Sequence, residues 1–199
     1  MLILKVRSEQ ILYVENLLKK TSFGQRGDGS RRYNNGNKEE QFVGLLGEVV
    51  STDLFRYKRP ECEDVGDKGV DLIIHGQKID VKTMGRSCDV KNHFIHNLQG
   101  DQVGDYYKND IYLFTSLNKR FMELTICGWV TKEEFFERAL FYPYGTVRRN
   151  PSKTFRVRSK KGLYEIKNYK LNPFKNRRQF CKEMELLQEC SSKQSIKVG

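Results

Sequence analysis

Residues 69–83 constrain the fold of this chain more than any other segment, because they read as one β-hairpin: Gly-Val-Asp-Leu-Ile-Ile-His-Gly-Gln-Lys-Ile-Asp-Val-Lys-Thr. The dipeptide Gly76-Gln77 suits a two-residue type II′ turn, since glycine takes the positive φ that the first turn position needs. The uninterrupted apolar run 72–74 favours a central strand that is covered on both faces. We therefore predict a β-hairpin over residues 70–83.

The predicted register distributes the side chains of the hairpin between two faces. Partners across a hairpin share a face, and side chains alternate along each strand. The expected register pairs Asp71 with Lys82. One face is then apolar and the other carries charge; the apolar set is Leu72, Ile74, Ile79 and Val81, and the charged set is Asp71, Asp80 and Lys82. The alternative is a solvent-facing sheet surface with a salt bridge, which contributes little to stability.

A third carboxylate, that of Glu48, precedes the hairpin in the sequence. Residues 39–56 have the apolar periodicity of a helix, and Glu48 lies beside its apolar stripe. Gly44 and Gly47 each weaken a helix by roughly 1 kcal/mol relative to alanine. Their expected use is a close approach of helix to sheet, which would bring Glu48 over the hairpin. The alternative is that Glu48 is an exposed helix residue.

The remaining patterns predict one α/β domain with a mixed β-sheet of about four or five strands between helices. Thr-Lys-Glu-Glu at 131–134 is a capping box that starts a helix. Residues 84–109 lack periodicity and predict a long loop that holds a short helix at most. The other predicted elements are helices 8–20 and 173–190, strands 110–117 and 121–130, strand-like pieces 154–158 and 163–166, a mobile basic loop 21–38 and a frayed end 191–199.

The set Glu48, Asp71 and Asp80-Val81-Lys82 resembles the PD-(D/E)XK nuclease superfamily, which has the restriction-endonuclease-like fold. The resemblance covers roughly residues 39–140, and residues 141–199 would form a basic C-terminal extension of the same domain. Val70 stands where the named motif has proline, a change that removes no metal ligand.

The resemblance implies a magnesium-dependent nuclease, most simply an endodeoxyribonuclease, in which Mn²⁺ would substitute for Mg²⁺. Asp71 and Asp80 would bind the ion with the Val81 carbonyl. Glu48 would bind a second ion or hold a water, and Lys82 would orient the attacking water, help to deprotonate it and neutralise charge on the phosphate. Two alternatives stay open: an inactive nucleic-acid-binding module of this fold, and an RNA-directed or effector nuclease.

The net charge of +11 points to a nucleic-acid partner, and the resemblance favours DNA over RNA. Residues 140–199 hold 15 basic and 4 acidic residues, which accounts for the whole excess. The alternative is a solvated tail. The candidate phosphate-binding residues are Arg86, Arg148, Arg149, Lys153, Arg156, Arg158, Lys160 and Lys161. Nearby rings that could stack on bases or belong to the core are Tyr142, Tyr144 and Phe155.

Other function classes find little support in the sequence. There is no apolar run long enough for a membrane span and no signal-peptide pattern at the start, so we expect a cytoplasmic protein that could form a homodimer. Five cysteines without a Cys-x-x-Cys pair argue against a disulfide framework. Cys88, His93 and His96 could form a zinc site, but their spacing matches no common ligand pattern. The alternative is that they are ordinary polar residues of the predicted loop, which would border the substrate groove with Arg86, Lys91, His93 and His96.

Overall fold

A five-stranded mixed sheet forms the centre of the protein in the computed structural model, which describes all residues except 21–37, 62–68, 105, 151–152 and 197–199. The strand order is β1 (Leu2–Lys5), β6 (Glu123–Thr131), β5 (Ile111–Asn118), β3 (Gln77–Arg86) and β2 (Leu72–Ile74). Strands β3 and β5 are parallel and the other neighbours are antiparallel. The predicted mixed α/β fold is confirmed at this level.

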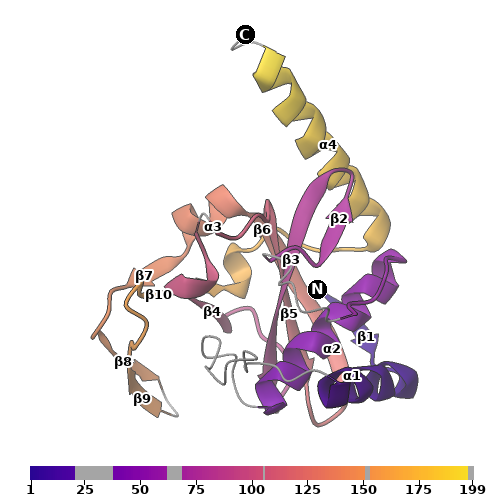
Figure 1. Cartoon of the computed structure of the whole chain (residues 1–199). Helices are drawn as coiled ribbons and strands as arrows, with labels where there is room; N and C mark the ends of the chain where they lie inside the picture. Colours follow the sequence, from indigo (N-terminus) through magenta and orange to yellow (C-terminus); the bar gives the residue numbers. More distant parts are fainter. Residues whose placement is uncertain (21–37, 62–68, 105, 151–152, 197–199) are drawn as a thin grey trace.

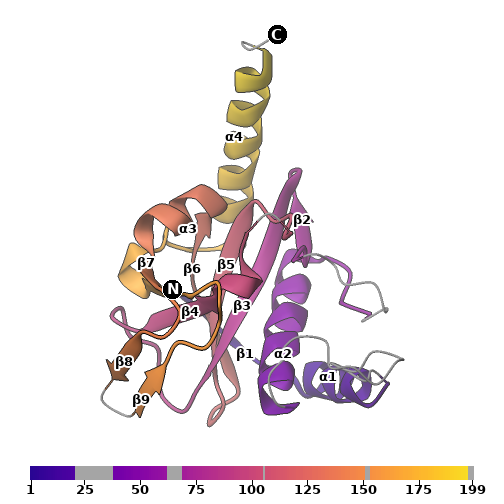
Figure 2. The same ribbon diagram turned by 60° about the vertical axis from the view of Figure 1, so that its left-hand side comes forward.

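One face of the sheet is covered by helices (Figure 2). They are α1 (Ser8–Lys20), α2 (Lys38–Phe55) and the first turns of α4 (Arg177–Ile196). The approach of α2 to β3 is close at Gly47, where a Cβ atom would lie 1.7 Å from the Thr83 hydroxyl oxygen. Gly44 does not lie at a close approach of this kind, because a Cβ there would meet no described atom within 4 Å.

The opposite face of the sheet is covered mainly by a second, smaller sheet (Figure 2). Its strands are β4 (Ile95–Gln99), β10 (Leu163–Lys167) and β7 (Leu140–Tyr142), and the short helix α3 (Lys132–Arg138) packs beside it. The expectation of helices on both faces is therefore correct for one face. The aromatic rings of Tyr112, Phe114 and Phe135 pack together in the layer between the two sheets.

The predicted loop 84–109 is more ordered than expected. Strand β3 continues to Arg86, and β4 forms within the segment because it can pair with β10, which lies far away in the sequence. The expected short helix is present as the 3-10 turn η1 (Gly100–Gln102). Pairing partners this distant are invisible to local periodicity.

Two parts of the chain extend from this body. The hairpin of β8 (Val147–Asn150) and β9 (Lys153–Arg156) forms an arm at one side of the second sheet, and α4 projects beyond the end of the main sheet (Figure 1). Helix α4 continues to Ile196, so the expected fraying from residue 191 is wrong up to that point. The 3-10 turn η2 (Asn168–Lys170) connects β10 to the segment before α4. The predicted loop 21–38 lies almost wholly outside the described residues.

The other predicted helices form close to their expected bounds. Helix α1 begins at Ser8 as expected, and α2 begins one residue earlier than predicted. The capping box is confirmed, since the Thr131 side chain accepts a hydrogen bond from the Glu134 backbone N–H, and the Glu134 side chain accepts one from that of Thr131.

The hairpin itself has a different register from the predicted one. Its turn residues are His75 and Gly76, both with positive φ (46° and 77°), as in a type I′ turn. Ile74 therefore pairs with Gln77 rather than with Ile79, and the expected pair of Asp71 with Lys82 does not form. The error is a shift of two residues, and such a shift preserves the face on which each side chain lies.

The expectation of a central strand at 72–74 is also wrong. Strand β2 lies at the edge of the sheet, and Ile73 is 46% exposed. The apolar face of the hairpin is confirmed, since all four of its predicted members are buried in one cluster with residues of α2 and α4; they are Leu72, Ile74, Ile79 and Val81.

Candidate active site

Asp80 and Lys82 form an ion pair on the face of β3 that turns away from α2. The Lys82 Nζ lies 2.8 Å from Asp80 Oδ1, and the side chains are 22% and 2% exposed. In the parallel register with β5, Asp80 lies beside Tyr112 and Lys82 beside Phe114. These buried rings give the pair a surrounding of low polarity, in which the attraction between opposite charges is stronger than in water.

Asp71 reaches the same strand from the residue before β2. Its backbone N–H donates to the Ile79 carbonyl (2.9 Å), and its carboxylate Oδ2 accepts from the Val81 backbone N–H (2.6 Å). Strand β2 pairs with β3 only as far as Ile79. Beyond this point the Asp71 carboxylate, and not a backbone carbonyl of β2, accepts the Val81 N–H. The structure thus brings Asp71, Asp80 and Lys82 together, although through a different register than the sequence suggested.

The charges of the site fix the protonation of Lys82. Burial by itself would lower the pKa of the ammonium, but the negative charges of Asp80 and Asp71 outweigh it and raise the pKa well above its ordinary value. Burial also raises the pKa of the neighbouring Tyr112 phenol to about 12. Lys82 is therefore a cation, and Tyr112 a neutral phenol, throughout the range in which proteins usually work.

Glu48 stands on a helix that covers the other face of the sheet. Its neighbour Gly47 contacts Thr83, whose side chain points away from those of Asp80 and Lys82. Glu48 is half-buried on α2. Within the described part of the chain, no three His, Cys, Asp or Glu side chains gather as a set that could hold a metal ion. The role of Glu48 stays a prediction.

Tyr107 borders the site, and the sequence reasoning missed it. The Lys82 Nζ lies 5.9 Å from the centroid of the Tyr107 ring. The same ring packs against Gly69, where a Cβ would lie 2.7 Å from Tyr107 Cδ1 and 3.1 Å from Asp80 Oδ2. The sequence offered one signal for it, a pair of adjacent tyrosines in a polar, glycine-containing segment. That segment has no periodic apolar face, so the rings were not expected to be part of a helix or strand core.

Two of the predicted phosphate-binding arginines have partners within the protein. The half-buried Arg86 donates to the Ile95 carbonyl (2.6 Å) and lies over the Phe94 ring, and burial lowers its pKa. Arg148 lies 4.1 Å from the Tyr142 ring centroid and pairs with Glu165 at 2.5 Å.

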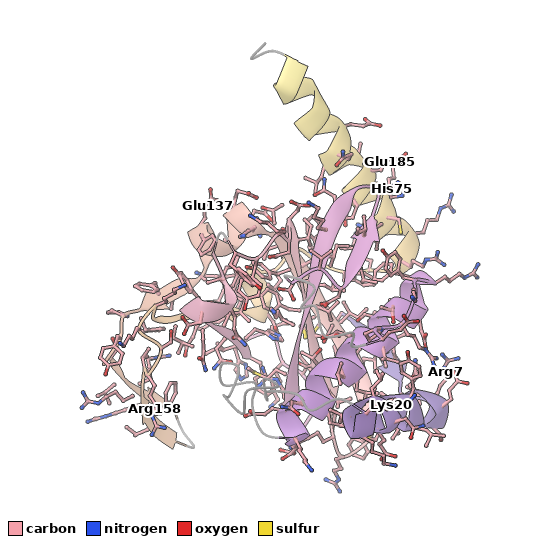
Figure 3. All side chains as sticks on the ribbon, viewed as in Figure 1. Arg7, Lys20, His75, Glu137, Arg158 and Glu185 are labelled. Carbon is pink, nitrogen blue, oxygen red and sulfur yellow. The ribbon has the colours of Figure 1, made fainter. Side chains whose placement is uncertain are left out.

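Most of the other predicted phosphate-binding side chains face solvent, and Arg158 follows the β9 strand of the arm (Figure 3). The exposed ones are Arg149, Arg156, Arg158, Lys160 and Lys161. Lys153 belongs to β9, but its side chain is outside the described ones. Among the nearby rings, Tyr144 is 64% exposed, whereas Tyr142 and Phe155 are half-buried.

His96 is a core residue and does not border a groove. It is 2% exposed, and its ring lies 4.9 Å from the Phe114 ring. Burial, followed by the charge of Arg86, lowers its pKa to about 3.

The zinc alternative gains no support, since no such ligand set occurs among the described residues. Cys88, His93 and Lys91 are exposed. The four described cysteines are free thiols.

Comparisons of this chain with protein families, curated proteins and solved structures gave no match. None of the helices in the described ranges has the length and apolar character that crossing a membrane requires.

Proposed function

We propose that this protein is a metal-dependent phosphodiesterase, a nuclease of the PD-(D/E)XK type. One observation carries the proposal: the carboxylates of Asp71 and Asp80 converge on the Val81 segment of β3, with the Lys82 ammonium 2.8 Å from Asp80. Burial of a carboxylate beside a lysine has a desolvation cost, and a sheet can be stable without such a pair. Strongly perturbed pairs of this kind are enriched at functional sites.

The donor set suits Mg²⁺ or Mn²⁺, which prefer oxygen ligands and keep positions open for substrate. Asp71 and Asp80 would hold the ion. The Val81 carbonyl would join them, because it faces the same strand edge as the Val81 N–H that the Asp71 carboxylate accepts. When bound, the ion supplies Lewis-acid charge to the phosphate group.

The residues of the chain itself would position the reacting groups. Lys82 would hold a phosphate oxygen or the attacking water through its ammonium and neutralise the charge that develops. Because Asp80 and Asp71 raise its pKa, Lys82 acts in this proposal as a cation and not as the proton acceptor that the resemblance suggested. The Tyr107 ring would limit access of bulk water to this ammonium.

The basic surplus of the C-terminal part supports a nucleic-acid substrate. The exposed cations Arg156 and Arg158 lie on or next to the β8–β9 arm, outside the main sheet. Contacts of such residues with phosphates do not depend on base identity. DNA remains the favoured substrate through the resemblance alone, and an endonuclease is the proposed activity.

One observation favours a second candidate function, a binding module without activity. Glu48 is on the helix that covers the opposite face from Asp80, and Lys82 already supplies a counter-charge to that carboxylate. A module of this kind would bind nucleic acid through the same basic arm without cleaving it.

A gel assay distinguishes the two candidates. Purified protein is incubated with plasmid, linear duplex, single-stranded DNA and RNA, each with Mg²⁺ and with a chelator. Cleavage that requires Mg²⁺ supports the nuclease and shows its substrate class. Binding of these substrates without cleavage in either Mg²⁺ or Mn²⁺ supports the inactive module.

A further inference from the structure

Tyr106 and Tyr107 form an aromatic pair at the edge of the candidate site. Their ring centroids lie 5.3 Å apart in an edge-to-face arrangement. Tyr107 is the inner ring, held between Gly69 and the Lys82 ammonium. Tyr106 is the outer ring and is 66% exposed. The pair thus leads from the partly buried Lys82 ammonium to an aromatic surface open to solvent.

The backbone that carries this pair is fixed in place by Lys132 at the start of α3. The Lys132 Nζ donates to the Gly104 carbonyl (2.9 Å) and to the Tyr107 carbonyl (2.7 Å). The Tyr107 N–H also donates to the Gly104 carbonyl (3.1 Å). Hydrogen bonds to a charged group are stronger than those between neutral groups. A backbone held by such bonds loses little further conformational freedom when a ligand binds beside it.

We propose that Tyr106 is a stacking platform for an unpaired nucleobase, next to the phosphate that Lys82 would bind, so that the substrate of this site is single-stranded or unpaired at the point of cleavage. The inference rests on the proposed function and names its substrate class. A base within a duplex is covered by its neighbours, whereas an unpaired base can place its face on an aromatic ring. Tyr106 lies within a few nucleotide steps of Lys82, at about 3.4 Å for each step of a stacked strand.

The chemistry of the surroundings favours a nucleotide over an apolar partner. A protein partner would need a broader apolar surface than one ring, whereas a base with its phosphate needs one ring and one cation. The pair Tyr106 and Lys82 offers that combination, with Tyr107 between them.

The test measures binding of a short oligonucleotide that contains the fluorescent base 2-aminopurine, whose emission falls on stacking. Every protein in the series carries Asp80→Asn, so that the strand is not cut. Tyr106→Ala should weaken binding of the single strand about tenfold, as loss of one base stack predicts. Tyr106→Trp should restore both affinity and quenching, and binding of the same strand in a duplex should change by less than about twofold.

Tyr169→Ala is the matched control, because Tyr169 is also exposed (59%) and has a lysine, Lys167, 5.6 Å from its ring, but belongs to η2 on the second sheet. Its affinity should stay within about twofold of the parent. The proposal is overturned if Tyr106→Ala binds the single strand as tightly as the Asp80→Asn protein that is its parent. It is also overturned if Tyr169→Ala loses as much affinity as Tyr106→Ala, or if the parent binds the duplex more tightly than the single strand. Failure of the nuclease proposal is seen separately, as absence of Mg²⁺-dependent cleavage by protein with Asp80 intact.

Discussion

The carboxylate of Asp71 and the backbone N–H of Val81 are joined by a hydrogen bond of 2.6 Å, which ties the residue before the edge strand β2 to the middle of β3. This contact places one acidic side chain beside the Asp80–Lys82 pair although the ladder between the two strands has already ended. The hydrogen bond also explains why Asp71 keeps a fixed position outside the regular strand. The two carboxylates therefore approach Lys82 from different segments, Asp80 from β3 itself and Asp71 from the residue before β2.

Removal of Lys82 should destabilise the protein more than removal of the charge on Asp80. Lys82→Met leaves a carboxylate that is 2% exposed without its cation, which costs about 3 kcal/mol or more. Asp80→Asn leaves an ammonium that still has solvent contact and the Asp71 charge nearby. Urea denaturation would measure both. Equal destabilisation by the two substitutions would show that the pair contributes little through its charges.

Mg²⁺ should restore part of the stability that Lys82→Met loses. A divalent ion that binds the folded protein at the carboxylates raises its stability by mass action and replaces the missing positive charge. The melting temperature of Lys82→Met should therefore rise with Mg²⁺ concentration more steeply than that of Lys82→Met with Asp80→Asn. Parallel curves for the two proteins would contradict a metal site at Asp80.

Glu48→Gln should melt like the wild type and cleave very slowly if Glu48 contributes to the metal site. Glutamine keeps the size of this half-buried side chain, so the free energy of unfolding should change little, whereas a metal-site carboxylate loses a charge that the ion requires. Cleavage at limiting Mg²⁺ and in excess Mn²⁺ would be compared. Full activity at limiting Mg²⁺ would restrict the site to Asp71, Asp80 and Lys82.

The exposed arginines of the arm should set the salt dependence of nucleic-acid binding. Arg156→Ala with Arg158→Ala should reduce the slope of log affinity against log salt by about 1.4 to 1.8, depending on whether the strand is single or double. Arg148→Ala is the contrasting variant, because Arg148 pairs with Glu165 and should affect stability rather than the slope. An unchanged slope in the double variant would remove the arm from the interface.

His96 should make the protein less stable in mild acid. Burial, together with the charge of Arg86, lowers its pKa from 6.5 to about 3 in the folded state. Between these values the unfolded chain binds more protons, so stability is full above about pH 6.5 and falls, by up to about 1.4 kcal/mol per pH unit, as the pH drops toward 3. The slope of stability against pH should be smaller in His96→Phe by about one proton. Equal slopes in His96→Phe and the wild type would contradict this.

The sequence predicted the shared face of Asp80 and Lys82 correctly because side-chain alternation survives a shift of two residues. It misplaced the turn, since Gly76 was assigned to the first turn position and the structure has it at the second. It also overlooked β4, which depends on pairing with β10 across more than sixty residues of sequence. Tyr107 could not be assigned to the site for the same reason, as its contacts with Gly69 and Lys82 are long-range.

The central claim is that the carboxylates of Asp71 and Asp80 form a hydrolytic metal site, and the rate of Mg²⁺-dependent cleavage in a matched set of Asp→Asn variants tests it most directly. Asp110→Asn is the control, because Asp110 also accepts a backbone N–H from β3, that of Lys78 at 2.8 Å, but is exposed and outside the site. We expect Asp71→Asn and Asp80→Asn to cleave at least about a hundredfold more slowly than Asp110→Asn, which should match the wild type. Equal cleavage by all three variants, or no cleavage by the wild type with either metal, would contradict the account.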